Sequence, residues 1–260
     1  MNVTPTFELL SGKSVSRIGF GAMRLTGQPG NFGPYHDWES GKRLLQHAVE
    51  SGVQFFDSAF AYGPQWSDKI IADALSPYSD ELVIATKGGV DKPAPGKAVV
   101  DASPETLTKQ IDIALSNLKT DCIDLFQLHR VDPNIPLEDS IGALEQARSA
   151  GKIEMIGLSN VTRQQLETAL EITEIASVQN RFNQSEHDDE DLVEYTNSKG
   201  IAYLPWGPLG ADPFKQGAKL PPRESIAWLL KRSPNIVAIP GTTSSSHLDE
   251  NLTAWDLVED

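Results

Sequence analysis

Residues 103–130 read SPETLTKQIDIALSNLKTDCIDLFQLHR, and this stretch joins a helical pattern to a strand pattern. Ser103 is a suitable N-cap, and Pro104 suits the first position of a helix. The apolar side chains that follow fall on one helical stripe, at Leu107, Ile111, Ala114, Leu115 and Leu118. The apolar run Ile123–Leu128 then predicts a strand buried on both faces, as in a parallel sheet covered by helices.

The same alternation of strand and helix recurs along the chain. The strand-like runs are Ile18–Met23, Phe55–Ala59, Leu82–Thr86, Ile123–Leu128, Met155–Leu158, Ala176–Gln179, Ile201–Pro205 and Ile236–Ile239. Eight alternations predict one α/β domain over residues 1–260, a (β/α)8 TIM barrel. An open dinucleotide-binding sheet is less consistent with the sequence, because GFG at 19–21 lacks the third glycine of GxGxxG.

The N-terminal and C-terminal parts of the predicted barrel differ from the regular repeat of strand and helix. Gly12 indicates a short β-hairpin before the first barrel strand. The path from Leu209 to Glu224 is short and rich in proline and glycine, which leaves little seventh helix before Asn235. The chain also ends soon after the last predicted helix, Ser246–Trp255. We therefore expect a barrel that is abbreviated near helix 7 and at the C-terminus.

The composition excludes several classes of partner. A net charge of −14 argues against nucleic acid or an anionic membrane. The sequence has no apolar run of about 18 residues and no signal-peptide pattern at its polar N-terminus, so we expect a cytoplasmic protein. The single cysteine, Cys122, fits a reducing compartment, and no cluster of metal ligands stands out. The expected assembly is a monomer or a weak homo-oligomer.

Titratable side chains stand at the ends of three consecutive predicted strands. Asp57, Lys87 and His129 are these residues, and Tyr62 lies in the loop just after Asp57. In such barrels the carboxyl ends of the strands share one rim, where active-site groups gather. Taken singly, the four could be a loop aromatic, a structural ion pair and a core histidine, and Lys87 could be the Schiff-base lysine of an aldolase. The set in this order favours a catalytic site.

The motifs around these residues resemble those of the aldo-keto reductase family, over nearly the whole chain. They are Phe56-Asp57-Ser58-Ala59 with Ala61-Tyr62-Gly63, Ala85-Thr86-Lys87, Leu125-Phe126-Gln127-Leu128-His129, Gly157-Leu158-Ser159-Asn160, Val178-Gln179-Asn180, Trp206-Gly207-Pro208-Leu209-Gly210 and Ile239-Pro240-Gly241-Thr242. Residues 21–27 and the loop at 32–34 are similar to a bacterial branch that includes pyridoxal reductases. The resemblance implies NAD(P)H-dependent reduction of a small-molecule aldehyde or ketone to an alcohol, with pyridoxal as one candidate.

The resemblance also assigns roles to the four residues. It implies Tyr62 as general acid, Lys87 as its modulator, Asp57 as the partner of the lysine, and His129 as the donor that orients the carbonyl. The chemistry is consistent, because a phenol with a pKa of about 10 is a poor acid near neutrality, and a nearby ammonium lowers that pKa. Hydride transfer itself belongs to the nicotinamide.

A cofactor site is implied on the same rim. Ser159, Asn160 and Gln179 would hold the nicotinamide carboxamide, and Trp206 would stack on the ring. Strand-end capping and a core tryptophan are the ordinary alternatives for these residues. Barrel phosphate sites form after strands seven and eight, where the candidates are Leu209, Gly210, Gly241, Thr242, Thr243, His247, Glu250 and Asn251.

The choice between the two nicotinamide cofactors is less direct. Many family members have a lysine after Ile-Pro and an arginine six residues later, and both serve the 2′-phosphate of NADPH. This chain has Gly241 and His247 at those positions. We expect NADPH from the resemblance to the branch, and the two missing cations leave NADH as the alternative.

The rim loops should select the substrate. The aromatic candidates for a pocket wall, with loop packing as their alternative, are Phe32, Tyr35, Phe60 and Trp66. Arg24 or Arg130 could meet an anionic group or remain solvated. A rival hypothesis is a non-catalytic, cofactor-binding regulatory subunit on the same barrel, as the beta subunits of potassium channels suggest.

Overall fold

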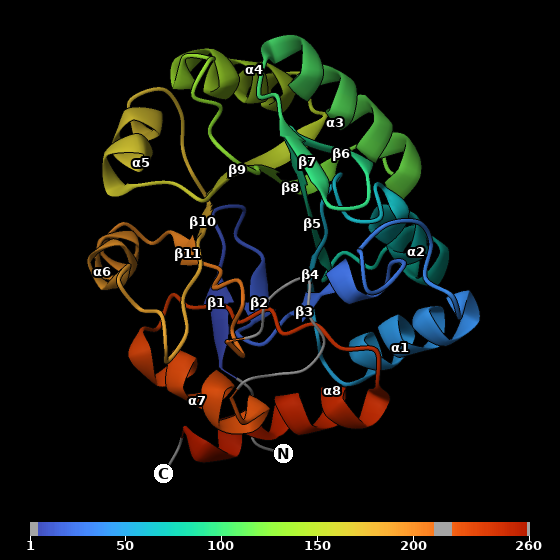
Figure 1. Cartoon of the computed structure of the whole chain (residues 1–260). Helices are drawn as coiled ribbons and strands as arrows, with labels where there is room; N and C mark the ends of the chain where they lie inside the picture. Colours follow the sequence, from blue (N-terminus) through green and yellow to red (C-terminus); the bar gives the residue numbers. More distant parts are fainter. Residues whose placement is uncertain (1–4, 211–219, 259–260) are drawn as a thin grey trace.

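A sheet of parallel strands forms the centre of the computed structural model, which describes residues 5–210 and 220–258. Seven strands are hydrogen-bonded in the order β11-β10-β9-β8-β5-β4-β3, and they curl into a ring surrounded by helices (Figure 1). The strands are β3 (Phe20–Gly21), β4 (Phe55–Asp57), β5 (Val83–Gly88), β8 (Ile123–Leu128), β9 (Ile153–Ser159), β10 (Ser177–Gln179) and β11 (Ala202–Tyr203).

An extended segment at residues 235–240 fills the eighth position and closes the ring. The Val237 amide donates to the Tyr203 carbonyl at 3.0 Å on one side, and the Gly19 amide donates to the Ala238 carbonyl at 2.8 Å on the other. Its contacts with both neighbours are single parallel bridges, not a regular strand. The predicted (β/α)8 barrel is therefore confirmed, with an irregular eighth strand.

The helices lie outside the ring and bury one face against it. They are α1 (Trp38–Glu50), α2 (Trp66–Leu75), α3 (Pro104–Leu118), α4 (Leu137–Ser149), α5 (Arg163–Leu170), α6 (Glu190–Ser198), α7 (Pro222–Arg232) and α8 (Ser245–Leu252), with 3-10 turns η1 (Ala22–Arg24) and η2 (Thr253–Leu257). Ser103 caps α3 by accepting from the Thr106 amide, as its sequence predicts. None of the described helices is long and apolar enough to cross a membrane.

The seventh helix is longer than expected. α7 has 11 residues. It begins at Pro222, because a proline is well tolerated in the first turn of a helix. Residues 211–219, most of the short path into it, lie outside the described residues. At the other end of the chain, the last helix ends at Leu252 and continues as η2.

The predicted N-terminal hairpin is present and closes the amino end of the barrel. β1 (Thr6–Glu8) and β2 (Ser14–Ser16) pair antiparallel, and Gly12 has a φ of +82° in their connection. Leu9 and Val15 are buried in one apolar cluster with side chains from the barrel interior, such as Phe55 and Val83. The opposite, carboxyl end is therefore the open one.

A second hairpin, which the sequence did not lead us to expect, stands at that open end. β6 (Val90–Ala94) and β7 (Lys97–Val100) pair antiparallel between β5 and α3. β6 alternates buried and exposed residues, but one of its two buried residues is a lysine, and β7 is mostly exposed, so the two strands lack the apolar pattern of a core strand. The turn at Pro95-Gly96, where Gly96 has a φ of +73°, is the signal that could have found the hairpin.

A buried arginine joins the first part of the barrel to its last segments. Arg17 donates from Nε to the Ile236 carbonyl at 2.9 Å, and from Nη2 to the Leu230 carbonyl at 2.8 Å. Its guanidinium also lies 5.5 Å from the centre of the Trp255 ring. The residue before the first barrel strand thus binds the eighth strand, α7 and η2 together.

Candidate active site

A buried ion pair joins the ends of β4 and β5. The Lys87 ammonium donates to both Asp57 oxygens at 2.7 and 2.8 Å, and to the Ser58 carbonyl at 2.7 Å. Asp57 also accepts from Gln179 Nε2 at 2.9 Å. Lys87 is fully buried and Asp57 is 3% exposed. Because each ion has the other and further hydrogen bonds, both can remain charged at this depth.

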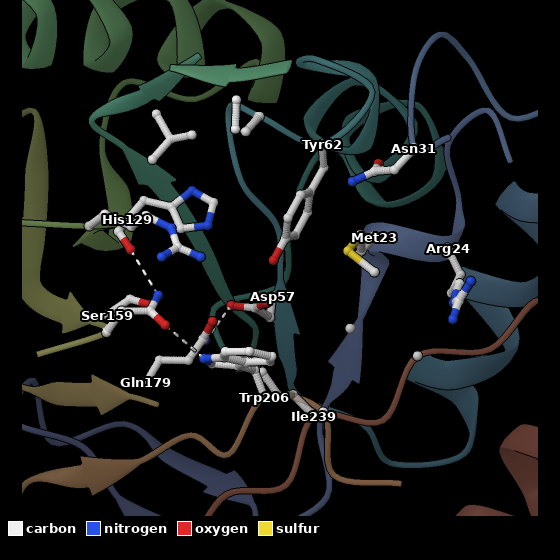
Figure 2. Close-up of a pocket in the computed structure, with 18 of the residues that line it drawn as sticks. Met23, Arg24, Asn31, Asp57, Tyr62, His129, Ser159, Gln179, Trp206 and Ile239 are labelled. Carbon is white, nitrogen blue, oxygen red and sulfur yellow. Dashed lines mark hydrogen bonds between the residues drawn. The ribbon is translucent and has the colours of Figure 1, made fainter. Parts of the chain in front are cut away.

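Tyr62 and His129 stand next to this pair. The Lys87 ammonium lies 5.0 Å from the centre of the Tyr62 ring, and the Tyr62 and His129 rings meet edge to face, 6.0 Å apart. Figure 2 shows the Tyr62 side chain pointing down toward Asp57 inside a pocket. The four residues predicted from the strand ends are therefore brought together at one place.

The pKa of Tyr62 differs from the prediction. Burial raises the pKa of Tyr62, and the Lys87 ammonium opposes that rise without reversing it. We expected the lysine to lower the pKa below its ordinary value, but desolvation of the phenolate is the larger effect. The tyrosine therefore stays a protonated phenol at neutral pH, which is the form that can donate a proton.

Lys87 is held as a cation. Burial lowers the pKa of Lys87, but its interactions with Asp57 and Tyr62 together outweigh burial, so the pKa is raised. An ammonium has no lone pair with which to attack a carbonyl. The ion pair thus argues against the alternative of a Schiff-base lysine.

His129 is held in its neutral form. Burial lowers the pKa of His129 well below its usual value, and the Lys87 and Arg130 cations lower it further. A neutral imidazole keeps one N–H donor and one acceptor. Its Nδ1 atom is buried and has no hydrogen-bond partner in the part of the chain that the structure describes.

Asp57, Tyr62 and His129 line a cavity of about 380 Å³ at the carboxyl ends of the strands, whereas the fully buried Lys87 lies outside its lining. Nine of the residues predicted for the site line it: Asp57, Tyr62, His129, Ser159, Asn160, Gln179, Trp206, Leu209 and Gly241. The other predicted cofactor residues lie outside its lining: Gly210, Thr242, Thr243, His247, Glu250 and Asn251. For these six, contact with a cofactor stays a prediction.

A short hydrogen-bond chain fixes the polar wall of the cavity. Trp206 Nε1 donates to Asn160 Oδ1 at 3.1 Å, and Asn160 Nδ2 donates to Ser159 Oγ at 2.9 Å. The Ser159 hydroxyl hydrogen and the Gln179 carbonyl oxygen remain for a ligand. One donor and one acceptor beside an indole fit a planar carboxamide ring, so the residues present fit a nicotinamide.

Gly241 lines the other end of the cavity, where a phosphate was expected. A Cβ atom at Gly241 would lie 2.7 Å from the Gly21 carbonyl oxygen, so any side chain there would require a backbone shift. The close contact fits the glycine that this chain has at this position. Nearby, Thr242 Oγ1 accepts from the Ser244 amide at 3.1 Å, which orders the turn into α8.

The aromatic residues predicted for the substrate wall do not line the cavity. Phe60 is buried, Phe32 is 36% exposed, and Tyr35 packs against the outer core. Trp66 begins α2 and packs edge to face against Trp38, with ring centres 5.8 Å apart. Substrate contact by these residues stays a prediction.

Other residues, which sequence reasoning missed, form that part of the lining. They are Met23, Asn31, Val90, Lys92, Gly96, Ala98 and Ile239. Four of them belong to the β6–β7 hairpin and its turn. Recognition of the hairpin could have pointed to these four, and no sequence pattern singles out Met23, Asn31 or Ile239.

A second buried carboxylate lies behind the ion pair. Asp68, fully buried in α2, accepts through Oδ1 from the Ser58 hydroxyl at 2.5 Å and from the Thr86 hydroxyl at 3.0 Å. Its other oxygen has no hydrogen-bond partner among residues 5–210 and 220–258. Burial raises the pKa of Asp68 to about 6.

Asp68→Asn should change how stability depends on pH. Because the folded pKa is about 6 and the ordinary value is 3.8, the stabilisation by the neutral acid is complete below pH 3.8 and lost as pH rises through 6. An amide does not titrate, so the wild type should lose on the order of 1–2 kcal/mol of unfolding free energy relative to the variant between about pH 5 and 7.5. Urea titrations at both pH values measure this difference, with exposed Asp121→Asn as control. A parallel pH dependence of wild type and Asp68→Asn would contradict it.

Comparison with known proteins adds to this geometry. A model of the aldo/keto reductase family matches residues 17–224. Pyridoxine 4-dehydrogenase of Escherichia coli is 40% identical, over 95% of this chain and 92% of that protein. An uncharacterised oxidoreductase of Schizosaccharomyces pombe is 36% identical, over 92% of this chain and 81% of its own. A solved thermostable aldo-keto reductase in complex with epalrestat is 26% identical, with a TM-score of 0.81 over 96% of this chain and 94% of that one.

Proposed function

The chain belongs to the aldo/keto reductase family and is an NAD(P)H-dependent oxidoreductase, and we propose that it reduces an aldehyde with Tyr62 as the proton donor. One observation carries the proposal. Tyr62, His129 and the Lys87–Asp57 pair meet at one cavity, beside a wall that fits a nicotinamide. This arrangement is what a reductase needs, and a regulatory subunit without catalysis would not need it.

The residues of the chain perform the proton transfer. When bound, the reduced nicotinamide supplies the hydride that adds to the carbonyl carbon. Tyr62 gives its hydroxyl proton to the carbonyl oxygen, so that the carbonyl becomes an alcohol. The Lys87 ammonium stabilises the phenolate that remains on Tyr62, and Asp57 keeps Lys87 in place. His129 donates a hydrogen bond to the carbonyl oxygen as negative charge develops on it.

NADPH is the cofactor that we propose. Ser159 and Gln179 would bind its carboxamide, and Trp206 would cover its ring. Arg24 lines the cavity, and its Cγ atom lies 3.6 Å from the place of a Cβ on Gly241. A cation at this end supplies positive charge near the expected phosphates, which Gly241 does not.

Pyridoxal is the substrate that we propose to test first. The relative at 40% identity is a pyridoxine 4-dehydrogenase, and oxidation of the hydroxymethyl group on carbon 4 of pyridoxine gives the aldehyde pyridoxal. The cavity of about 380 Å³ has room for part of a cofactor and one aromatic ring.

The experiment is a cofactor titration followed by an aldehyde panel. We expect NADPH to bind more tightly than NADH. The absorbance of NADPH should fall only when an aldehyde such as pyridoxal is added. Tight cofactor binding without turnover on any aldehyde would favour the regulatory subunit instead. Failure to bind either nicotinamide would overturn the proposal.

A further inference from the structure

The described residues that line the cavity include more cationic than anionic side chains, although the net charge of the chain is −14. Three cationic side chains line it, namely Arg24, Lys92 and Arg130. Among its described lining residues the one carboxylate is that of Asp57, and the buried Lys87 ammonium neutralises it. Among the described lining residues, the balance of charged side chains is thus opposite in sign to that of the whole protein. Such a local excess draws anions to this site.

The three cations occupy different parts of the cavity. Arg24 lies against Gly241, at the end where we place the cofactor phosphates. Lys92 is 4% exposed and donates from Nζ to the carbonyls of Gly30 and Asn31 at 2.8 and 2.7 Å. These bonds tie the β6–β7 hairpin to the loop after η1. They satisfy donors of Lys92, and the same side chain lines the cavity.

Arg130 belongs to the catalytic end. It follows His129 directly, at the end of β8, and it is close enough to lower the pKa of both His129 and Tyr62. In the ranges 5–210 and 220–258 its guanidinium makes no ion pair and no hydrogen bond. Cations gathered in one cavity repel one another unless an anion lies between them. A guanidinium is suited to bind a carboxylate or phosphate through paired hydrogen bonds.

We propose that Arg130, in the field of Lys92, binds an anionic group on the carbonyl substrate, so that the enzyme prefers aldehydes that carry a carboxylate or a phosphate. This inference rests on the proposed function and adds the class of substrate to it. The anionic group would sit near the mouth of the cavity while the carbonyl oxygen meets Tyr62 and His129.

Matched pairs of substrates test the preference. One pair is 4-carboxybenzaldehyde and the uncharged 4-nitrobenzaldehyde, and the other is pyridoxal 5′-phosphate and pyridoxal. We expect the wild type to show a higher kcat/KM for the anionic member of at least one pair. A preference in the phosphate pair alone would identify a phosphate site, and a preference in both would identify a general anion site.

Substitution of Arg130 should remove this preference. In Arg130→Met the ratio of kcat/KM for the anionic over the neutral aldehyde should fall by about 10- to 100-fold, as expected for loss of one charge-assisted interaction. The loss should lie mainly in KM, because binding of a remote group is the same in the ground state and the transition state. Arg130→Lys should retain part of the ratio, since it keeps the charge without the fork.

Two further arginines provide controls. Arg43→Met removes the same charge from an exposed position on α1 and should leave the ratio unchanged. Arg24→Met removes a cation from the cofactor end and should also keep the ratio. An equal fall in Arg24→Met and Arg130→Met would overturn the assignment to Arg130.

Failure of this inference can be told from failure of the proposed function. If the wild type reduces both members of each pair equally well, the inference is wrong and the reductase assignment stands. If no aldehyde leads to consumption of the cofactor, the proposed function is wrong. The inference about Arg130 is then tested by the binding of an anionic alcohol to the protein. Titration of 4-(hydroxymethyl)benzoate against tryptophan fluorescence should then show binding at least about ten-fold weaker in Arg130→Met. Equal binding by wild type and variant would overturn it.

Discussion

Tyr62→Phe should lower kcat for aldehyde reduction by about 10²- to 10⁴-fold and leave the affinity for cofactor nearly unchanged. The substitution removes one hydroxyl, the proton donor, and keeps the ring that contacts His129 edge to face at 6.0 Å. The cavity wall that would hold the nicotinamide comes from other strands. Steady-state kinetics with saturating NADPH, together with a fluorescence titration of the cofactor, measure the two effects separately.

The matched control for this variant is Tyr195→Phe. Tyr195 lies on α6, outside the ring of strands, where the Arg163 guanidinium covers its ring at 4.2 Å. Its kcat should equal that of the wild type. A Tyr62→Phe enzyme that retains the full rate would show that another group donates the proton. Loss of cofactor affinity in step with kcat would show a structural role for Tyr62 instead.

Lys87→Met should damage both stability and catalysis. Methionine keeps the length of the side chain but removes the cation, so Asp57 becomes an unpaired charge that is 3% exposed. Breaking a buried ion pair in this way costs about 3–5 kcal/mol of unfolding free energy. Catalysis should fall by at least about 10²-fold, because the phenolate of Tyr62 loses its stabilising cation. Urea denaturation and single-turnover reduction measure the two losses.

A second substitution separates the two effects. Asp57→Asn combined with Lys87→Met removes both charges, so it should recover much of the lost stability without recovering the rate. The exposed pair Lys119–Asp73, with side chains 58% and 40% exposed, is the control, and Lys119→Met should cost less than about 1 kcal/mol. A Lys87→Met variant as stable as Lys119→Met would mean that Asp57 does not depend on its partner.

The strands and the four central residues could be predicted because burial constrains them. Ile123–Leu128 is apolar since it contacts helices on one side and the barrel interior on the other. The polar residues that end such strands, like Lys87 and His129, must then share one rim. Strand order alone therefore brought them together, without knowledge of any distance.

The rest depended on contacts that sequence patterns do not encode. The β6–β7 hairpin has mostly exposed side chains, so no apolar alternation predicts it. Trp66 looked like a pocket wall by its place after Tyr62, but it starts a helix and packs on Trp38. The raised pKa of Tyr62 follows from the depth of the site, which required the packed structure. Gln179 binds Asp57, and no spacing along the chain indicates that hydrogen bond.

The way in which the ring closes has a consequence for synthesis of the protein. Arg17 and Ile236 are in direct contact but lie 219 residues apart in the sequence. While the chain emerges from the ribosome, its first barrel strand lacks one neighbour until that distant segment has been translated. Until residues 235–240 arrive, β3 and β11 expose unpaired amides and carbonyls that could pair with another nascent chain. Docking of residues 235–240 thus protects both of these strands from misassembly.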